Sequence, residues 1–425
     1  MLILYYIIFL IPIKIKSIIK IPFEKKIESN LITPEYLCKN KIKSNITIGS
    51  LNEKIEIIFD LSNQKIYIPD STFQKINYNI KKSSSYKLIS KIKDCEIDDI
   101  KFNCFESLED LIFENEKNKK EKISELSFIL LEKNKTEISN GIIGLKLNEK
   151  SFINQLKNKN YIENYTFIIS YENDFKGEII FGNYPHIYNK KYYKEEDFFF
   201  LPIQSSIYSS WKITFDSISY IKGKVDNYEI AILNFNFGGI LGSLLYQKYL
   251  NQTFFKDYFL NKSCSLNYFT YYEDYDYEIK YSQIICDKNI NITNFPPLNF
   301  TKKQYNITIT LTYEDLFRIY NDKYYLMVFF EVTQIFEWIL GEPFFWKYET
   351  VFDVDKSIIG FYKKIKKEKD YKVVYIIVII ILSFLVICLS IILFINISKK
   401  PRKKRAYELD DNDYEYIQQS NMKIN

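Results

Sequence analysis

The 425-residue chain has little of what many catalytic sites require. It contains a single histidine, His186, which argues against Ser-His-Asp and Cys-His nucleophilic sites and against zinc sites built on histidine. It also lacks a glycine-rich phosphate loop and a Cys-x-x-Cys pair. We expect His186, which lies in a Gly-Asn-Tyr-Pro-His turn, to be an ordinary surface residue, and we expect no metal and no cofactor.

A large excess of one charge is also missing. The net charge is +5, and much of the basic excess lies beside one apolar segment, so the sequence does not indicate a nucleic-acid partner. Hydrophobic residues make up 47% and charged residues 26% of the chain, which is typical of globular proteins. The length is enough for roughly two to three domains.

An apolar run near the amino terminus, Leu2 to Ile13, is too short to cross a bilayer, which takes about 20 residues. We interpret it as the core of a signal peptide that occupies residues 1–17. A basic start and a small-x-small cleavage site are both missing. A buried strand is therefore the alternative interpretation.

A second apolar segment, residues 373–397, is uncharged and long enough to cross the membrane as a tilted helix. Basic residues lie on both sides of it, so their count does not decide the orientation. The amino-terminal signal does. It predicts a single-pass type I protein of the secretory pathway or cell surface, whose residues before 373 are lumenal or extracellular and whose tail, 398–425, is cytoplasmic.

The predicted tail contains Tyr414-Glu-Tyr-Ile417, a Tyr-x-x-apolar pattern that resembles sorting signals bound by clathrin adaptors. Tyr414 and Ile417 would occupy two pockets of such an adaptor. The chain has 37 tyrosines, so a chance match is the alternative.

Five of the six cysteines lie in the predicted lumenal part, where disulfides persist. The pairs closest in sequence are Cys264 with Cys286 and Cys95 with Cys104, which would leave Cys38 unpaired. The sixth cysteine lies in the apolar segment.

The predicted lumenal part also carries N-x-S/T sequons, so we expect a glycoprotein. Two of them, at Asn164 and Asn306, fall in predicted strands and are the weakest acceptors. The sequons begin at Asn45, Asn134, Asn164, Asn251, Asn261, Asn291, Asn299 and Asn306.

Between the two apolar ends, short apolar or alternating runs separated by Asn, Asp, Gly and Pro predict a mainly β protein. Short amphipathic helices are expected at 152–159, 241–250 and 313–319. The expected strands are 55–59, 65–68, 166–170, 178–181, 211–220, 229–233 and 305–311. We expect the Tyr- and Asp-rich stretch 271–281 to be a solvated loop.

A weak internal repeat predicts two similar lobes. The segments 55–69 and 229–242 share a plan of strand, Asx-containing turn and strand. Each is followed, after a long interval, by an apolar strand that ends in glycine, at 141–145 and at 338–345.

Three longer segments carry a resemblance to a known family. Residues 140–162, 177–188 with 211–220, and WILGEPFFWKYETVFDVDKSIIGF at 338–361 are similar, in this order, to motifs of the pepsin-like aspartic proteases. The resemblance implies a bilobal fold with a pseudo-twofold axis and a peptide-binding cleft. It places an amino-terminal lobe at 41–200, after a segment at 18–40, and a carboxy-terminal lobe at 201–362.

The resemblance also places the catalytic loops, which in this family carry Asp-Thr-Gly-Ser once in each lobe. The first loop keeps the aspartate as Asp60, whereas the second has an amide, Asn234, at that position. The neighbouring cleft positions have changed too, to Leu61, Ser62, Phe235 and Asn236. The Tyr-Gly pair expected at the tip of the family's flap is not found, since neither Tyr78 nor Tyr86 is followed by glycine.

Aspartic protease chemistry requires two carboxyl groups that share one proton, and an amide cannot ionise to exchange roles. The family's threonines also reach across the lobe interface with their hydroxyls. Leu61 and Phe235 have no hydroxyl, so we expect this polar contact to be lost and replaced by apolar packing. We therefore expect a catalytically inactive protein that binds a peptide or protein in its cleft. In it, Asp60 would be a turn residue that accepts hydrogen bonds from its own loop.

Two alternatives remain open. The first is an active membrane-anchored aspartic endopeptidase of the secretory pathway, in which Asp60 works with an unrecognised partner. The second is a structural or adhesion protein whose cleft is filled by Phe235 and Phe237.

Overall fold

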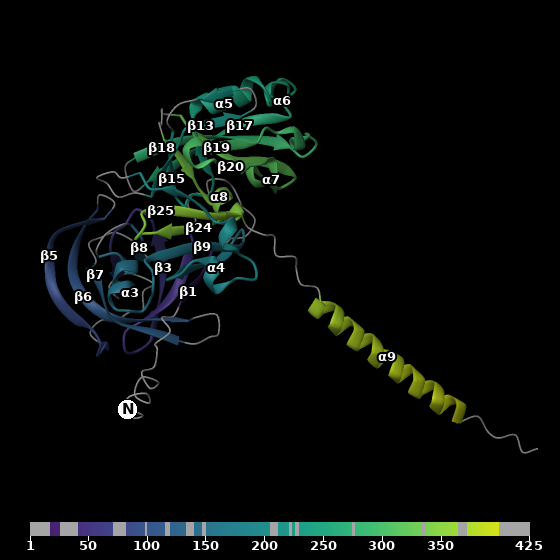
Figure 1. Cartoon of the computed structure of the whole chain (residues 1–425), viewed down its shortest axis with the longest axis horizontal. Helices are drawn as coiled ribbons and strands as arrows, with labels where there is room; N and C mark the ends of the chain where they lie inside the picture. The colour runs from purple at the N-terminus through teal and green to yellow at the C-terminus, as the bar shows by residue number, and fades with distance from the viewer. Residues whose placement is uncertain are drawn as a thin grey trace, which may run out of the picture. The chain divides into compact units, whose positions relative to one another are not determined.

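A computed structural model of the chain describes most of its residues, in thirteen segments. These are residues 18–25, 41–70, 82–97, 100–114, 120–132, 140–146, 150–204, 211–220, 223–225, 229–273, 277–332, 337–363 and 372–398. The chain divides into two compact units, 1–364 and 365–425, which we describe separately (Figure 1).

The first unit is built mainly of strands, as predicted. Its described strands form sheets of thirteen, eight and four strands, and short helices alternate with them along the sequence (Figure 1). The four-stranded sheet belongs to the second half of the unit and has the order β14 (Gly223–Val225), β13 (Ser217–Tyr220), β19 (Leu298–Lys302), β20 (Ile307–Leu311).

The two larger sheets contain the same six-strand arrangement. In the first lobe the order is β3 (Glu53–Asp60), β8 (Gly141–Gly144), β4 (Ile66–Pro69), β7 (Lys120–Glu132), β6 (Ile100–Glu114), β5 (Lys87–Ile97). In the second it is β15 (Glu229–Leu233), β23 (Glu337–Leu340), β16 (Ile240–Gly242), β22 (Lys323–Glu331), β18 (Tyr277–Asp287), β17 (Cys264–Glu273).

Strand directions match at every step of this arrangement. The first pair is parallel in both lobes, β3 with β8 and β15 with β23, and the next pair is antiparallel. The third pair, β4 with β7 and β16 with β22, is parallel again. The last two pairs are antiparallel in both lobes. The internal repeat predicted from the sequence is therefore confirmed as two lobes of equal topology.

Strands from the beginning, the middle and the end of the first unit join the sheet that carries the first lobe. Their order is β11 (Phe199–Pro202), β25 (Ile358–Lys363), β24 (Tyr348–Asp353), β9 (Thr166–Asn173), β10 (Lys176–Phe181), β1 (Ile19–Glu24), after which β2 (Lys43–Ile48) leads to β3. We call the six strands from β11 to β1 in this order the joining sheet. Its central strands are buried on both faces. Phe167 and Phe352 belong to the main core, whereas Ile168 and Val351 belong to a separate cluster.

The described helices of the first unit are short. They are α3 (Phe152–Asn158), α4 (Pro185–Tyr188), α5 (Leu244–Gln252), α6 (Lys256–Leu260), α7 (Tyr313–Leu316) and α8 (Glu342–Lys347). The first and second predicted helices are confirmed in α3 and α5, although α5 begins only after the cap Ser243 because Gly242 still belongs to a strand.

The third predicted helix is wrong in its second half. A capping box between Thr312 and Asp315 starts α7, but Phe317 already has extended backbone angles and begins β21 (Phe317–Tyr320), which pairs with β22. The predicted strand 211–220 is likewise divided, into β12 (Lys212–Phe215) and β13. The predicted strand 305–311 begins only at Ile307, so Asn306 lies in an exposed turn rather than in a strand.

The predicted solvated loop at 271–281 is also wrong. Most of these residues lie in the hairpin of β17 and β18, and Tyr281 is buried and pairs with Glu331. The many charges of the stretch suggested a loop, but tyrosine and isoleucine at alternate positions favour a strand.

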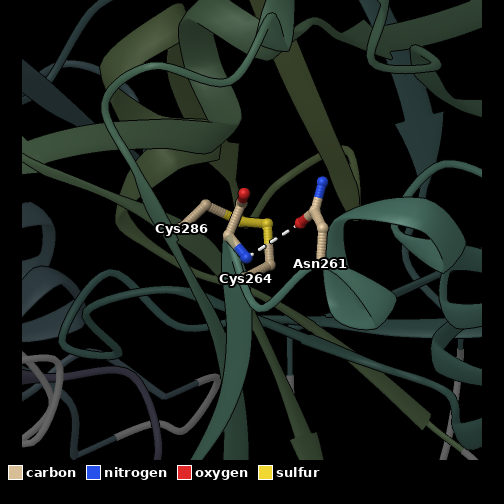
Figure 2. Close-up of a disulfide and its surroundings, with 4 residues drawn as sticks. Asn261, Cys264 and Cys286 are labelled. Carbon is tan, nitrogen blue, oxygen red and sulfur yellow. Dashed lines mark hydrogen bonds between the residues drawn. A yellow bond between two sulfur atoms is a disulfide. The ribbon is translucent and has the colours of Figure 1, made fainter.

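The predicted disulfide between Cys264 and Cys286 is confirmed (Figure 2). The two residues are direct partners in the β17–β18 ladder, with Cα atoms 4.0 Å apart. Beside them the backbone N–H of Ser263 donates to Oδ1 of Asn261. Cys104 also forms a disulfide. Its predicted pairing with Cys95 remains a prediction, because the side chains of Cys95 and Cys38 lie outside the described part.

In the second unit the structure describes one helix, α9 (Lys372–Ser398). Among the described residues it is the one helix long and apolar enough to cross a membrane, over Val378–Ile395. This finding and the fold of the first unit fit a membrane-anchored protein. The predicted signal peptide at 1–17 and the tail motif Tyr414 to Ile417 lie outside the described residues.

Candidate functional site

The first candidate loop begins where β3 ends, at Asp60. Its carboxylate is partly buried and accepts three hydrogen bonds from its own loop. Oδ1 accepts from the backbone N–H and the hydroxyl of Ser62, at 2.7 and 2.6 Å, and Oδ2 accepts from Nδ2 of Asn63, at 2.6 Å. Both carboxylate oxygens are thus engaged within a tight Asx-type turn, as expected for a capping aspartate.

The second candidate loop begins one residue after β15 ends, at Asn234. Oδ1 of Asn234 accepts the backbone N–H of Asn236 at 3.0 Å, which matches the bond from Ser62 N–H to Asp60. The backbone N–H of Asn234 donates to Leu340 O, at the end of the neighbouring parallel strand. By topology and by local hydrogen bonding, Asp60 and Asn234 therefore hold equivalent places in the two lobes.

Each loop closes over a glycine that no larger residue could replace without movement of the backbone. A Cβ on Gly144 would lie 2.5 Å from the carbonyl oxygen of Asn63, and one on Gly341 would lie 2.1 Å from that of Gly239. These glycines end the apolar strands β8 and β23, or follow them directly. The sequence pattern of an apolar strand that ends in glycine thus marks the close approach of two backbone segments.

A side chain of the second loop reaches across to the first lobe. Nδ2 of Asn236 donates to the carbonyl oxygen of Phe59, the residue before Asp60, at 2.7 Å, and Oδ1 of Asn236 accepts the N–H of Ile42 at 3.3 Å. We expected polar contact across the interface to be lost together with the threonine hydroxyls. That expectation is wrong in part, because the side-chain amide of Asn236 supplies such a contact.

The apolar residues of the two loops are packed into the cores. Leu61 is 7% exposed and Phe235 is fully buried, edge-on to Phe345 at a centroid distance of 6.0 Å. Phe237 packs edge-on against Phe329 at 5.7 Å. Tyr171 from the joining sheet donates to Phe235 O at 3.2 Å, so the second loop is held from several sides.

The structure describes no hydrogen bond that joins Asp60 to Asn234 directly, and within the described part no carboxylate is hydrogen-bonded to Asp60. The hairpin β5–β6 follows the first loop in sequence. Tyr86 precedes this hairpin, and its hydroxyl contacts Ser107 Oγ at 2.9 Å. The other flap candidate, Tyr78, lies outside the described residues.

Sequence reasoning missed a buried ion pair behind the second loop. Lys25, just after β1, donates from Nζ to Oε1 of Glu342 at 2.7 Å, and both side chains are at most 1% exposed. Burial raises the pKa of Glu342 from 4.5 to about 7, although Lys25 opposes the shift. No local sequence signal indicates this pair, because Lys25 and Glu342 are 317 residues apart.

Two six-stranded lobes of equal topology, whose equivalent loops meet through Asn236 and Phe59, define the class of bilobal pepsin-like proteins. A comparison with protein families agrees with this assignment, since the model of the eukaryotic aspartyl proteases matches residues 42–364. The chain belongs to the eukaryotic aspartyl protease family. No curated protein matches the chain in a sequence comparison.

Proposed function

We propose that the chain is a membrane-anchored, catalytically inactive member of its family that binds a peptide or protein between its lobes. The observation that carries the proposal is the amide Asn234 at the place equivalent to Asp60, with no carboxylate among the described hydrogen-bond partners of Asp60. One carboxylate and one amide cannot share and exchange a proton as two carboxyls do.

The same two residues are suited to binding. Nδ2 of Asn234 has no hydrogen-bond partner among the described residues, and an amide N–H can donate to the carbonyl oxygen of a peptide. The carboxylate of Asp60 can accept from a peptide N–H, although its own loop already supplies three donors. The second loop is held by Asn236 and Tyr171, so little order has to be gained when a ligand binds.

The arrangement in the membrane completes the proposal. The family domain lies before α9, and residues 1–17 have the character of a signal peptide, so the lobes face the lumen or the exterior. The cytoplasmic tail, with Tyr414 and Ile417, then offers a sorting signal to a clathrin adaptor.

The test compares the full chain, in detergent or lipid nanodiscs, with Asp60→Asn and Asn234→Asp variants. Each is incubated with a peptide library between about pH 3 and about pH 7, the range in which carboxyl groups exchange protons. We expect the wild type to cleave no faster than Asp60→Asn while it retains peptides from the library. The Asn234→Asp variant should fold, because its carboxylate keeps the acceptor for Asn236 N–H.

Cleavage by the wild type that pepstatin inhibits and Asp60→Asn abolishes would show the active endopeptidase instead. If no peptide is retained and none is cleaved, the binding role is refuted and a structural role is favoured. A further variant, Asn234→Ala, locates the bound peptide. If the wild type retains peptides and Asn234→Ala does not, the peptide binds between the lobes.

A further inference from the structure

The structure contains a pocket of about 600 Å³ that the interlobe site does not use. It is formed by α4, the residues that follow it, β11 and the start of β25, on the outer face of the joining sheet. This face carries the cluster of Ile168 and Val351, whereas the neighbouring residues Phe167 and Phe352 turn to the main core on the opposite face. The volume is within the range of small-molecule sites, about 300–1,000 Å³.

The walls of the pocket are largely apolar and in part open to solvent. Phe198 and Phe200 lie with their ring centroids 6.0 Å apart, and Phe200 is 42% exposed. Ile187 on α4 is 46% exposed. Large apolar side chains that stay exposed around a concave site are typical of ligand-binding surfaces.

A cation is fixed at the pocket by an aromatic residue. Lys356 donates from Nζ to the hydroxyl of Tyr184 at 2.9 Å and lies over its ring, 4.8 Å from the centroid. The nearest carboxylate, Asp353, is 3.9 Å from Nζ, but it is only 3% exposed, whereas the lysine side chain is 63% exposed. The ammonium therefore faces solvent with protons to spare for a ligand.

A carboxylate and the single histidine complete the polar part. Nδ1 of His186 is engaged by the hydroxyl of Tyr362, and Nε2 has no hydrogen-bond partner among the described residues. Burial lowers the pKa of His186, and among the nearby charges Glu195 raises this pKa whereas Lys356 lowers it. Glu195, Lys356 and His186 all line the pocket, so the pocket carries one negative and one positive side chain beside the imidazole.

One positive and one negative charge beside apolar walls select the ligand. A simple anion would be opposed by Glu195 and a simple cation by Lys356, whereas a molecule with both charges satisfies each of them. We propose that this pocket binds a zwitterion with an apolar side chain, namely a free apolar amino acid or a dipeptide. Lys356 binds its carboxylate, Glu195 its ammonium, and Phe198 and Phe200 its side chain.

The test uses the dipeptide leucyl-phenylalanine with the full chain in lipid nanodiscs, and follows binding by saturation-transfer NMR. Two matched ligands lack one charge each, the N-acetyl form and the C-terminal amide. We expect the dipeptide to bind about five- to tenfold more tightly than either. Lys356→Met should remove the advantage over the amide, and Glu195→Gln the advantage over the N-acetyl form. Phe200→Ser should weaken all three.

The controls separate this pocket from the interlobe site. Binding between the lobes would be insensitive to Lys356→Met and Glu195→Gln and sensitive to Asn234→Ala, and that result would overturn the proposal. Equal affinity of the wild type for all three ligands would overturn the proposed binding of the ligand's two charges by Lys356 and Glu195. Absence of dipeptide binding up to about 10 mM would overturn the site itself. Because Lys356 and Glu195 are exposed, their variants should fold, which far-ultraviolet circular dichroism checks.

Discussion

Nδ2 of Asn236 lies 2.7 Å from the carbonyl oxygen of Phe59, and this hydrogen bond joins the two lobes one residue before Asp60. The resemblance to the family leads us to expect a glycine at position 236, and a glycine has no side chain with which to make this contact. The altered residues of the site are therefore not only losses, because at least one of them stabilises the lobe interface.

The first prediction concerns this contact. Asn236→Ala should lower the free energy of unfolding by about 1–3 kcal/mol, because it leaves the buried carbonyl of Phe59 without its donor. Chemical denaturation of the full chain measures the change. Asn103→Ala, at an exposed strand position, is the control and should change stability by less than about 0.5 kcal/mol. Equal effects of the two variants would contradict the assigned role.

The second prediction concerns the buried pair of Lys25 and Glu342. Lys25→Met leaves the carboxylate buried without its counter-charge, which should cost about 3–5 kcal/mol at pH 8. The folded pKa of Glu342, about 7, lies above its ordinary 4.5, so its favourable contribution is complete below about 4.5 and is lost as the pH rises through 7. The loss in the variant should therefore be much smaller at about pH 5.

Unfolding midpoints of wild type and variant at both pH values measure this difference. Lys43→Met is the matched control, since Lys43 and Glu56 lie at the same 2.7 Å but are 26% and 20% exposed. Its cost should stay below about 1 kcal/mol at either pH. A cost of Lys25→Met that does not depend on pH would show that packing, rather than charge, makes the residue important.

The third prediction concerns the disulfide of the second lobe. Replacement of both Cys264 and Cys286 by alanine should lower stability by about 3 kcal/mol, because the bond closes a loop with a sequence separation of 22. Thermal unfolding without reductant is the appropriate measurement, since a reductant would also attack the disulfide of Cys104. Cys388→Ala, which removes a free cysteine in α9, should leave the unfolding of the first unit unchanged.

The fourth prediction concerns the glycine beneath the second loop. Gly341→Ala places a Cβ 2.1 and 2.2 Å from two backbone oxygens, so the loop must move, and we expect a loss of about 3 kcal/mol or more. Gly242→Ala is milder, because its Cβ would meet side chains only, at 3.0 Å and beyond. Limited proteolysis and unfolding midpoints compare the two. A loss for Gly242→Ala as large as that for Gly341→Ala would contradict the explanation.

The general architecture could be predicted because its signals are local. Apolar runs that end in glycine, such as those before Gly144 and Gly341, occur where two backbone segments approach each other closely. Because this pattern is repeated in the sequence, it predicts two lobes. The disulfide of Cys264 and Cys286 could be predicted from proximity in sequence, since the two residues face each other across one hairpin.

Contacts between distant segments could not be predicted in this way. Nothing near Asn236 in sequence indicates that its amide would reach Phe59, and Lys25 and Glu342 are 317 residues apart. The strand at 271–281 was missed for another reason. Its polar composition conceals a buried residue, Tyr281, whose burial depends on pairing with β22.

The joining sheet also determines where a mechanical load would act. Any tension on α9 reaches the described part of the first unit at Lys363, the last residue of β25. That strand is paired on both sides, with β11 and with β24. To extract it, two ladders would have to break together, and β24 is itself paired with β9. A pull on α9 would therefore load the joining sheet through the two ladders that hold β25.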